Sequence, residues 1–347
     1  MSPVRFGVIG SGWRAEYFFR LAADRPDLFE IPAVAVRRST EVDRLAATFG
    51  LRASTDAHCV DDIGLDFVVV CTSAEANVDV CDDLVGRGHA VLLETPAGTD
   101  EADFTRLTDL AESGARIQVA EQYQYQPLLS ARLAVIRSGL LGPTVSARVS
   151  IAHAYHGVAL IRAALGVRGT EFSVSAHAHD SSIVRGPDRA GPPTTDDLVP
   201  SREVVATIAL DGRLGVYDWS DDQYFSWVRG LRFTVRGERG ELDGDTVRFI
   251  DAHGAPVEQT LHRVDTGLRG NLEAPGHRGY LLGERWVYEN PFPSTRWSDD
   301  EIAVATVLQR MADHVTTGTD FYPVSDGIHD ARIALAIAAS AESSDLA

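Results

Sequence analysis

The stretch Val4-Arg-Phe-Gly-Val-Ile-Gly10-Ser-Gly12-Trp-Arg-Ala15 decides the fold of this chain of 347 residues. A short apolar run ends in glycine, and the residues from Trp13 to Ala23 have the apolar spacing of a helix. The pattern G-x-G-x-x-A thus stands between a strand and a helix. There Gly10 permits a tight turn, Gly12 lets the backbone approach a pyrophosphate and Ala15 allows close packing. The stretch predicts a dinucleotide site formed by Gly10, Ser11, Gly12, Trp13 and Arg14.

Strand and helix patterns alternate through the first 120 residues. Phe67 to Cys71 is a continuously apolar strand, and Asn77 to Arg87 after it has helical spacing. Strands that are apolar on both faces belong in a parallel sheet covered by helices on both sides, and right-handed crossovers make such a sheet doubly wound. Residues 1–121 are therefore predicted to form a Rossmann domain, an α/β fold that binds NAD(P).

The pattern changes after residue 121. A helix is predicted from Leu128 to Ser138, and strand-like segments follow, several of which alternate apolar with charged residues, as Thr246 to Asp251 does. Such alternation is typical of a sheet with one solvated or partner-facing side. The composition of residues 185–201 indicates a loop, and Ser298-Asp-Asp-Glu301 has the form of a capping box. Residues 122–347 are predicted to form a second domain.

The residues after the second main strand bear on the choice of dinucleotide. Proteins that bind NAD usually carry an acidic residue there, which binds the ribose 2′-hydroxyl. Here the sequence reads Val34-Ala-Val-Arg37-Arg38-Ser-Thr40, which has no carboxylate. An arginine can bind a 2′-phosphate through two parallel hydrogen bonds. Arg37 and Arg38 therefore predict NADP as the cofactor, with NAD as the less favoured alternative.

The composition narrows the classes of partner. All 32 basic residues are arginine, and the formal net charge is −18. Without lysine the chain has no group for a Schiff base or a P-loop, and its acidity argues against a nucleic acid or an anionic membrane as partner. No apolar stretch approaches the roughly 20 residues of a transmembrane helix, and the first residues lack a signal-peptide pattern. We therefore expect a cytoplasmic protein with a small-molecule substrate.

No metal site is predicted. His153 and His156 are three residues apart, and His177 and His179 lie on one face of a predicted strand. Neither pair has a third ligand at a recognisable spacing.

Six segments together resemble the Gfo/Idh/MocA family of NAD(P)-dependent oxidoreductases, and the likeness covers nearly the whole chain. They are Gly7-Val-Ile-Gly-Ser-Gly-Trp13, Asp66-Phe-Val-Val-Val-Cys-Thr72, His89-Ala-Val-Leu-Leu-Glu-Thr-Pro96, Gln122-Tyr-Gln-Tyr-Gln-Pro127, Ile136-Arg-Ser-Gly-Leu-Leu-Gly-Pro143 and Phe321-Tyr-Pro-Val-Ser325. The resemblance implies that a Rossmann domain is followed by an α+β domain with a large, mainly antiparallel open sheet, which binds substrate. Because that sheet commonly forms subunit contacts in the family, a homodimer or homotetramer is implied too.

Two positions depart from the family pattern. The family's Glu-Lys-Pro motif reads Glu94-Thr95-Pro96 here. The family's lysine lies beside the nicotinamide ribose and assists proton transfer, which Thr95 cannot do because a hydroxyl does not titrate usefully near pH 7. In a second motif the family often has an aspartate four residues before a histidine. The histidine position falls on His156 and the aspartate position on Ala152.

Three residues are candidates for proton transfer, because reduction of a carbonyl or imine needs a proton donor besides the hydride. His156 ranks first, since histidine titrates near neutral pH and its position matches the family's. Tyr123, just after the sixth strand, ranks second, and Tyr155 follows. Five further residues are predicted to bind the cofactor, because they lie at strand ends or because the resemblance implies it. They are Thr72, Ser73, Glu94, Thr95 and Gln122.

These features predict an NADP(H)-dependent oxidoreductase that moves a hydride to or from a small polar substrate. Family analogy alone suggests a sugar-like substrate. The absent lysine and aspartate leave two other functions open: a dinucleotide-binding sensor or partner-binding protein without turnover, and an imine-type reductase.

Overall fold

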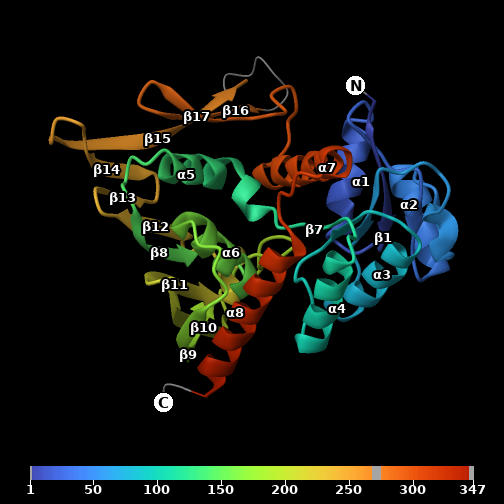
Figure 1. Ribbon diagram of the computed structural model, residues 1–347, viewed down its shortest axis with the longest axis horizontal. Helices are drawn as coiled ribbons and strands as arrows, with labels where there is room; N and C mark the ends of the chain where they lie inside the picture. The colour runs from blue at the N-terminus through green and yellow to red at the C-terminus, as the bar shows by residue number, and fades with distance from the viewer. Residues whose placement is uncertain (1, 268–274, 344–347) are drawn as a thin grey trace. The chain divides into compact units, whose positions relative to one another are not determined.

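The computed structural model describes residues 2–267 and 275–343, and the chain divides into two compact units (Figure 1). Unit 1 consists of Met1–Gln126 and Trp297–Ala331, and unit 2 of Pro127–Arg296 and Arg332–Ala347. The sequence predicts a single domain boundary after residue 121. The compact units differ from that prediction, because unit 1 also includes residues 297–331. Helix α7 (Asp299–Thr317) explains the difference, since it packs against the first helix and the central strands of unit 1.

Unit 1 is built on strands that all run parallel within the described residues, in the order β4-β3-β1-β5-β6-β7, with β2 paired to β1. The chain reverses direction across the sheet between β1 and β5, which is the doubly wound order of a Rossmann fold. The predicted fold class is therefore confirmed. The strands are β1 (Val4–Ile9), β2 (Phe29–Glu30), β3 (Val34–Ala35), β4 (Ala53–Ser54), β5 (Phe67–Val70), β6 (Val91–Leu93) and β7 (Ile117–Val119).

Helices cover both faces of this sheet. Helices α1 and α7 lie on one side of it and α3 and α4 on the other (Figure 1). Phe6 of β1 stacks on Phe67 of β5 with ring centroids 5.5 Å apart and meets Phe18 of α1 edge-on at 6.3 Å. The central strands are apolar on both faces because both faces are buried. The helical elements are α1 (Ala15–Asp24), α2 (Ser39–Phe49), η1 (Ala57–Val60), α3 (Ala74–Gly86), α4 (Glu101–Glu112) and η2 (Tyr123–Tyr125).

Unit 2 holds a second sheet, with the strand order β17-β16-β15-β14-β13-β12-β8-β11-β10-β9. Strands β8 and β11 are parallel and the other neighbours antiparallel, so the predicted mainly antiparallel open sheet is confirmed. The strands are β8 (Thr144–Ser150), β9 (Phe172–Val184), β10 (Leu198–Leu210), β11 (Arg213–Ser220), β12 (Arg232–Gly237), β13 (Gly240–Asp243), β14 (Thr246–Ile250), β15 (Pro256–Thr266), β16 (Gly276–Leu282) and β17 (Arg285–Glu289).

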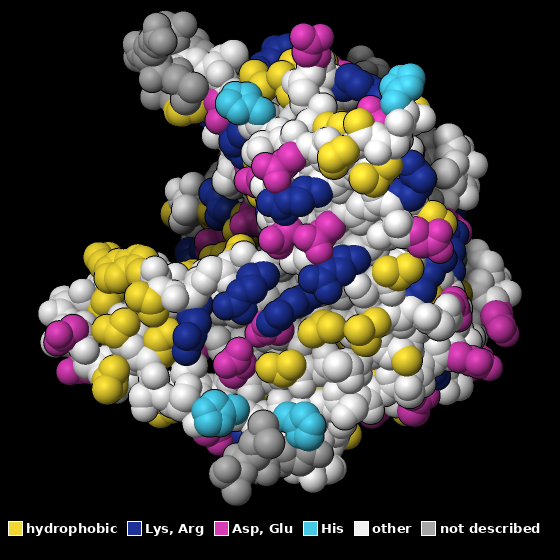
Figure 2. Space-filling model, turned by 90° about the vertical axis from the view of Figure 1, so that its left-hand side faces the viewer, with side chains coloured by type: hydrophobic (Ala, Val, Ile, Leu, Met, Phe, Trp, Pro, Cys, Tyr) yellow, Lys and Arg dark blue, Asp and Glu magenta, His cyan; other side chains and the backbone are white. Residues whose placement is uncertain are grey.

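The two faces of this sheet differ in character. Helices α5 (Pro127–Arg137) and α6 (Ala154–Leu165) pack on one face, where Val149 and Phe233 are buried (Figure 1). On the other face Asp218 of β11 pairs with Arg148 and, at 3.1 Å, with Arg232. Figure 2 shows arginine and acidic side chains lying next to one another on this side of the molecule. The alternation read from the sequence thus separates a core face from a charged face.

One predicted loop is shorter than expected. Residues 185–201 were expected to form a loop, but β10 begins at Leu198 and pairs with β9 from Leu198↔Val184 to Leu210↔Phe172. The outer half of this hairpin is rich in serine, histidine and aspartate and is largely exposed, so it lacks the apolar alternation that marks a strand. Backbone pairing between distant residues extends the strands there. Helix α8 (Val324–Glu342) begins in unit 1 and ends in unit 2, with η3 (Asp221–Tyr224) also in unit 2.

Candidate dinucleotide-binding and catalytic site

The glycine turn after β1 fits closely against the next strand. Gly10 has a φ of +122°, and its N–H donates a hydrogen bond of 2.9 Å to the carbonyl oxygen of Ala35. A Cβ on Gly10 would lie 2.1 Å from the carbonyl oxygen of Cys71, whereas a Cβ on Gly12 would meet no atom within 4 Å. The close packing between β1 and the end of β5 therefore requires Gly10, and Gly12 leaves open space in front of α1, which is where Rossmann folds bind a pyrophosphate.

A cavity of about 480 Å³ adjoins this turn at the carboxyl edge of the sheet. Its lining follows the ends of β1, β3, β4 and β5 and includes seven predicted cofactor-binding residues: Gly10, Ser11, Gly12, Arg37, Arg38, Thr72 and Ser73. Within the described part of the chain, Trp13 and Arg14 are not among the lining residues. Trp13 is 47% exposed, and its ring lies edge-on to that of Tyr17, with centroids 5.1 Å apart. The edge of a doubly wound sheet is where dinucleotides bind.

The cavity wall after β3 holds a carboxylate that the sequence prediction misses. Glu41 lies in the first turn of α2 and lines the cavity with Arg37 and Arg38. Its Oε1 lies 3.4 Å from Nη2 of the exposed Arg38. Hydrogen bonds from Arg44 and then from Ser11 hold the pKa of Glu41 below its ordinary value. The prediction considers only the strand end, whereas an acidic residue in the first turn of the following helix can also reach this wall.

Asn77 joins the ends of β5 and β6. The Thr72 hydroxyl donates to Asn77 Oδ1 at 2.7 Å, and Asn77 Nδ2 donates to the carbonyl oxygen of Glu94 at 3.4 Å. Asn77 is 1% exposed, so these bonds are shielded from water. Ser73 precedes α3 as its N-cap residue. The arrangement fixes the two loops that the sequence assigns to the cofactor.

Arg14, Glu94 and Gln122 come together although they follow three different strands. Arg14 Nε lies 2.8 Å from Glu94 Oε1, and Arg14 Nη2 donates to Gln122 Oε1 at 3.0 Å. Burial lowers the pKa of Arg14, but the charge of Glu94 and the hydrogen bond to it outweigh burial, so the pKa stays above its ordinary value. Arg14 is therefore a permanent cation beside Glu94. Thr95 follows Glu94 and is half-buried.

In unit 2, His156 and Tyr155 lie in the first turn of α6. His156 is 6% exposed, and its ring centroid lies 4.4 Å from that of Tyr155. His153, the N-cap residue, has its ring 4.9 Å from that of Tyr224, whose hydroxyl accepts a 3.0 Å hydrogen bond from the His153 N–H. Burial and then the neighbouring His156 lower the pKa of His153, against the charge of Asp221. The structure thus gathers titratable and aromatic rings at one helix end.

Tyr123, the remaining candidate for proton transfer, belongs to unit 1. It opens η2 after β7 and is half-buried, and its backbone N–H donates to Glu121 Oε1 at 3.0 Å. Residues 2–267 and 275–343 contain no group of three His, Cys, Asp or Glu side chains that could hold a metal ion. In the same described residues, no helix has the length and apolar character needed to cross a membrane.

Comparison with known proteins agrees with the Rossmann fold of unit 1. Residues 4–121 match the family model Gfo/Idh/MocA, described as an oxidoreductase family with an NAD-binding Rossmann fold. The rhizopine catabolism protein MocA of Rhizobium meliloti is 30% identical over 144 residues. That match covers 41% of this chain and 45% of the relative, so it spans less than half of either protein.

Solved structures share the fold over nearly the whole chain. An oxidoreductase domain protein from Kribbella flavida has a TM-score of 0.69 at 17% identity and covers 99% of this chain and 98% of its own. A Synechocystis biliverdin reductase in complex with biliverdin and NADP+ has a TM-score of 0.64 at 17% identity, covering 98% and 100%. An oxidoreductase from Agrobacterium radiobacter in complex with NAD+, L-tartaric acid and magnesium has a TM-score of 0.66 at 16% identity, covering 98% and 97%.

The sequence motifs, the strand order and the family match all concern the same part of the chain. Residues 4–121 therefore form a Rossmann domain that matches the NAD-binding Rossmann fold of the Gfo/Idh/MocA oxidoreductase family.

Proposed function

We propose that this chain is an NADP(H)-dependent oxidoreductase that transfers a hydride to or from a small polar substrate. The observation that carries the proposal is the cavity at the carboxyl edge of the unit 1 sheet. The cavity is lined by the glycine turn after β1 and by Arg37 and Arg38 after β3. A turn of this kind holds a pyrophosphate, and guanidinium groups beside the adenosine ribose suit a 2′-phosphate.

The preference for NADP rests on the state of the two arginines. Arg37 is exposed and has no ion pair or side-chain hydrogen bond within residues 2–267 and 275–343. Arg38 is 75% exposed, and its contact with Glu41 is long, at 3.4 Å. Both guanidinium groups can therefore turn toward a 2′-phosphate without breaking a strong bond, and each can bind it with two N–H donors.

Proton transfer is assigned to His156. Reduction of a carbonyl places a hydride on carbon, which NADPH supplies when bound, and a proton on oxygen. We assign that proton to a ring nitrogen of His156, which takes it back in the reverse reaction. Arg14 cannot serve, because its pKa lies above the ordinary arginine value, and Thr95 does not titrate. Arg14 instead holds Glu94 and Gln122 in place, and Tyr155 and Tyr123 remain as alternative donors.

Two other functions follow from the same residues. If Thr95 in place of the family's lysine abolishes turnover, the chain is a dinucleotide-binding sensor or partner-binding protein. If the substrate is an imine that is already protonated, hydride transfer alone completes its reduction, and the missing lysine costs little. A sugar-like substrate rests on family analogy.

The test has two steps. NADPH and NADH are titrated while protein fluorescence is recorded, with Trp13 next to the glycine turn as the expected reporter. The bound reduced cofactor is then offered panels of carbonyl and imine compounds. NADPH is expected to bind more tightly than NADH, and a carbonyl substrate is expected to oxidise it. A tenfold preference for NADH contradicts the NADP assignment, and tight binding without turnover favours the sensor.

The proton donor is tested on the substrate found. His156→Ala is expected to lower kcat by about 100-fold or more while the Kd for NADPH is unchanged. The control is His179→Ala, because His179 lies on β9 and is exposed. Full activity of His156→Ala would show that the proton comes from another group, and Tyr155→Phe and Tyr123→Phe then decide between the alternatives.

A further inference from the structure

The cavity of unit 1 is lined by a carboxylate as well as by Arg37 and Arg38. Glu41 is the acidic residue among its described lining residues, and its side chain is 15% exposed. A carboxylate beside a site for a 2′-phosphate repels the ligand that Arg37 and Arg38 attract. The same carboxylate is a good acceptor for a hydroxyl group.

Contacts with Arg44 hold Glu41 in this position. Arg44 Nε and Nη2 both lie 3.0 Å from Glu41 Oε2. Arg44 Nη1 also lies 3.0 Å from Glu16 Oε1 on α1, and Arg44 Nη2 donates to the carbonyl oxygen of Ser11 at 3.2 Å. Arg44 thus fastens the carboxylate to the glycine turn. The Glu41 carboxylate cannot swing out of the cavity without breaking these contacts.

The two oxygens of Glu41 are engaged unequally. Oε2 faces Arg44, whereas the contact of Oε1 with Arg38 is long and involves a side chain that is mostly exposed. Arg38 can leave Oε1 at little cost, since exposed ion pairs contribute about 0–1 kcal/mol. When the ligand has a ribose hydroxyl, Oε1 then accepts a hydrogen bond from it. When the ligand has a 2′-phosphate, Arg38 moves to bind that phosphate.

We propose that Glu41 sets the choice between the two dinucleotides. Its Oε1 accepts the 2′-hydroxyl of the adenosine ribose of NAD and opposes the 2′-phosphate of NADP, which Arg37 and Arg38 bind. The inference rests on the proposed function. It implies that the chain binds both dinucleotides and that Glu41 limits the preference for NADP. The usual acidic position at the strand end is filled by arginine, so the carboxylate reaches the ribose from the first turn of α2 instead.

The ratio of the Kd values for NADH and NADPH measures this choice. Glu41→Gln is expected to raise the Kd for NADH and lower the Kd for NADPH, so that the ratio moves about tenfold toward NADPH. Glu41→Asp keeps the charge on a shorter side chain, so it is expected to weaken NADH binding without strengthening NADPH binding. The matched control is Glu16→Gln, because Glu16 pairs with the same Arg44 but does not line the cavity.

The outcomes separate the inference from the proposed function. Thermal unfolding of each variant shows whether it is folded, and Glu41→Asp carries the test if Glu41→Gln is not. An unchanged ratio in folded Glu41 variants, or an equal shift in Glu16→Gln, overturns the role of Glu41. Wild-type protein that binds neither dinucleotide overturns the proposed function itself.

Discussion

Gly10 is the residue at which the loop after β1 has least freedom. Its φ of +122° is unfavourable for a residue with a side chain, and an added Cβ would lie 2.1 Å from the carbonyl oxygen of Cys71, directly after β5. Backbone atoms of a central strand cannot move aside as a flexible side chain can. The sequence motif and the packing therefore agree on the reason for this glycine.

Gly10→Ala is expected to destabilise the fold and abolish dinucleotide binding. Strain at positive φ and overpacking together cost about 3 kcal/mol in the free energy of unfolding. Urea denaturation measures this cost. Gly12→Ala is the control, because its Cβ would meet no atom within 4 Å. We expect it to remain stable and to lose affinity only, so equal stability losses in both variants would contradict the packing argument.

The pair of Arg14 and Glu94 gives a second prediction at the scale of the residue. The side chains are 22% and 7% exposed, so removal of the cation leaves a buried carboxylate without its partner. Arg14→Met is expected to cost about 3 kcal/mol of stability. Adding Glu94→Gln should recover part of that loss, because the uncompensated charge is then gone. Denaturant unfolding of the two single variants and the double variant measures the coupling, and additive effects would show that the pair does not interact.

At the scale of elements, short-range patterns were predictable and long-range ones were not. Ser298-Asp-Asp-Glu301 predicted a capping box, and α7 begins with one: the Ser298 hydroxyl accepts from the Glu301 N–H at 3.2 Å. Residues three apart fix such a cap, so the sequence contains its whole cause. The outer half of the β9–β10 hairpin was missed because its strands are held by pairing between residues far apart.

The candidate site shows the same limit. The glycine turn could be predicted because its residues are close together in the sequence. The contact of Arg14 with Glu94 joins residues 80 positions apart, and only the strand order brings them together. Glu41 was missed because its approach to the cavity depends on how α2 leaves β3. Residue types near strand ends are predictable, but their partners across the sheet edge are not.

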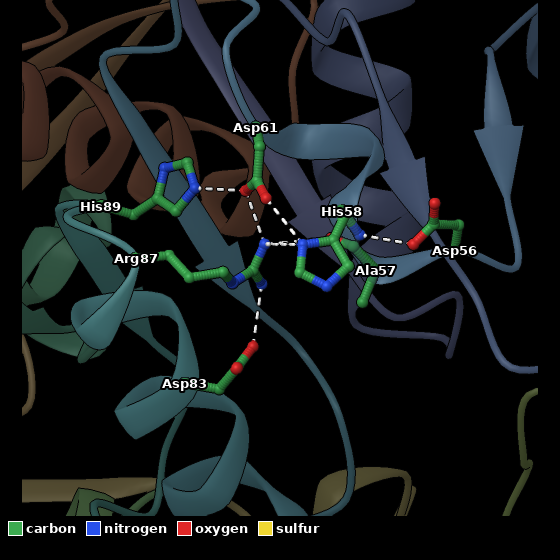
Figure 3. A network of polar contacts seen from close by, with 7 residues as sticks. All are labelled: Asp56, Ala57, His58, Asp61, Asp83, Arg87 and His89. Carbon is green, nitrogen blue, oxygen red and sulfur yellow. Dashed lines mark hydrogen bonds and ion pairs between the residues drawn. The ribbon is translucent and has the colours of Figure 1, made fainter.

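A polar network ties η1 to the end of α3 and the start of β6 (Figure 3). Asp61 accepts hydrogen bonds from Arg87 at 2.5 Å and His89 at 2.7 Å, and contacts His58 at 2.8 Å. These bonds, that of Arg87 first, hold the pKa of Asp61 well below its usual range. Ala57, at the start of η1, lines the cavity of unit 1 described above. The network therefore supports one wall of that cavity.

Asp61→Asn is expected to cost about 1–3 kcal/mol of stability at pH 7. Because the folded pKa is lowered, the carboxylate contributes fully above its unfolded pKa of about 4 and loses its contribution as the pH falls through the folded value. The stability difference between wild type and variant should therefore shrink below about pH 4. Asp83→Asn is the control, because the side chain of Asp83 is exposed and pairs with the same Arg87, at 2.9 Å. A difference that stays constant from pH 7 to pH 3 would contradict this.

At the scale of the whole molecule, helices α5 and α6 pack on one face of the open sheet of unit 2, and the opposite face has exposed side chains. Val205 of β10 and Leu214 of β11 are 41% and 45% exposed on that face, and they lie among the ion pairs of Asp218 with Arg148 and Arg232. Aliphatic groups among paired charges suit a contact with a second copy of the same surface. The family resemblance led to the same expectation of a homodimer or homotetramer.

We therefore expect light scattering coupled to size exclusion to give the mass of a dimer or tetramer for the wild type. Leu214→Glu should convert the oligomer to a monomer, because an unpaired carboxylate would be buried in the contact. The apparent affinity between subunits of this variant should fall by at least tenfold. Leu335→Glu is the control, since Leu335 is 46% exposed on α8 and not on the sheet. A monomeric wild type, or an oligomer that survives Leu214→Glu unchanged, would place the charged face in solvent.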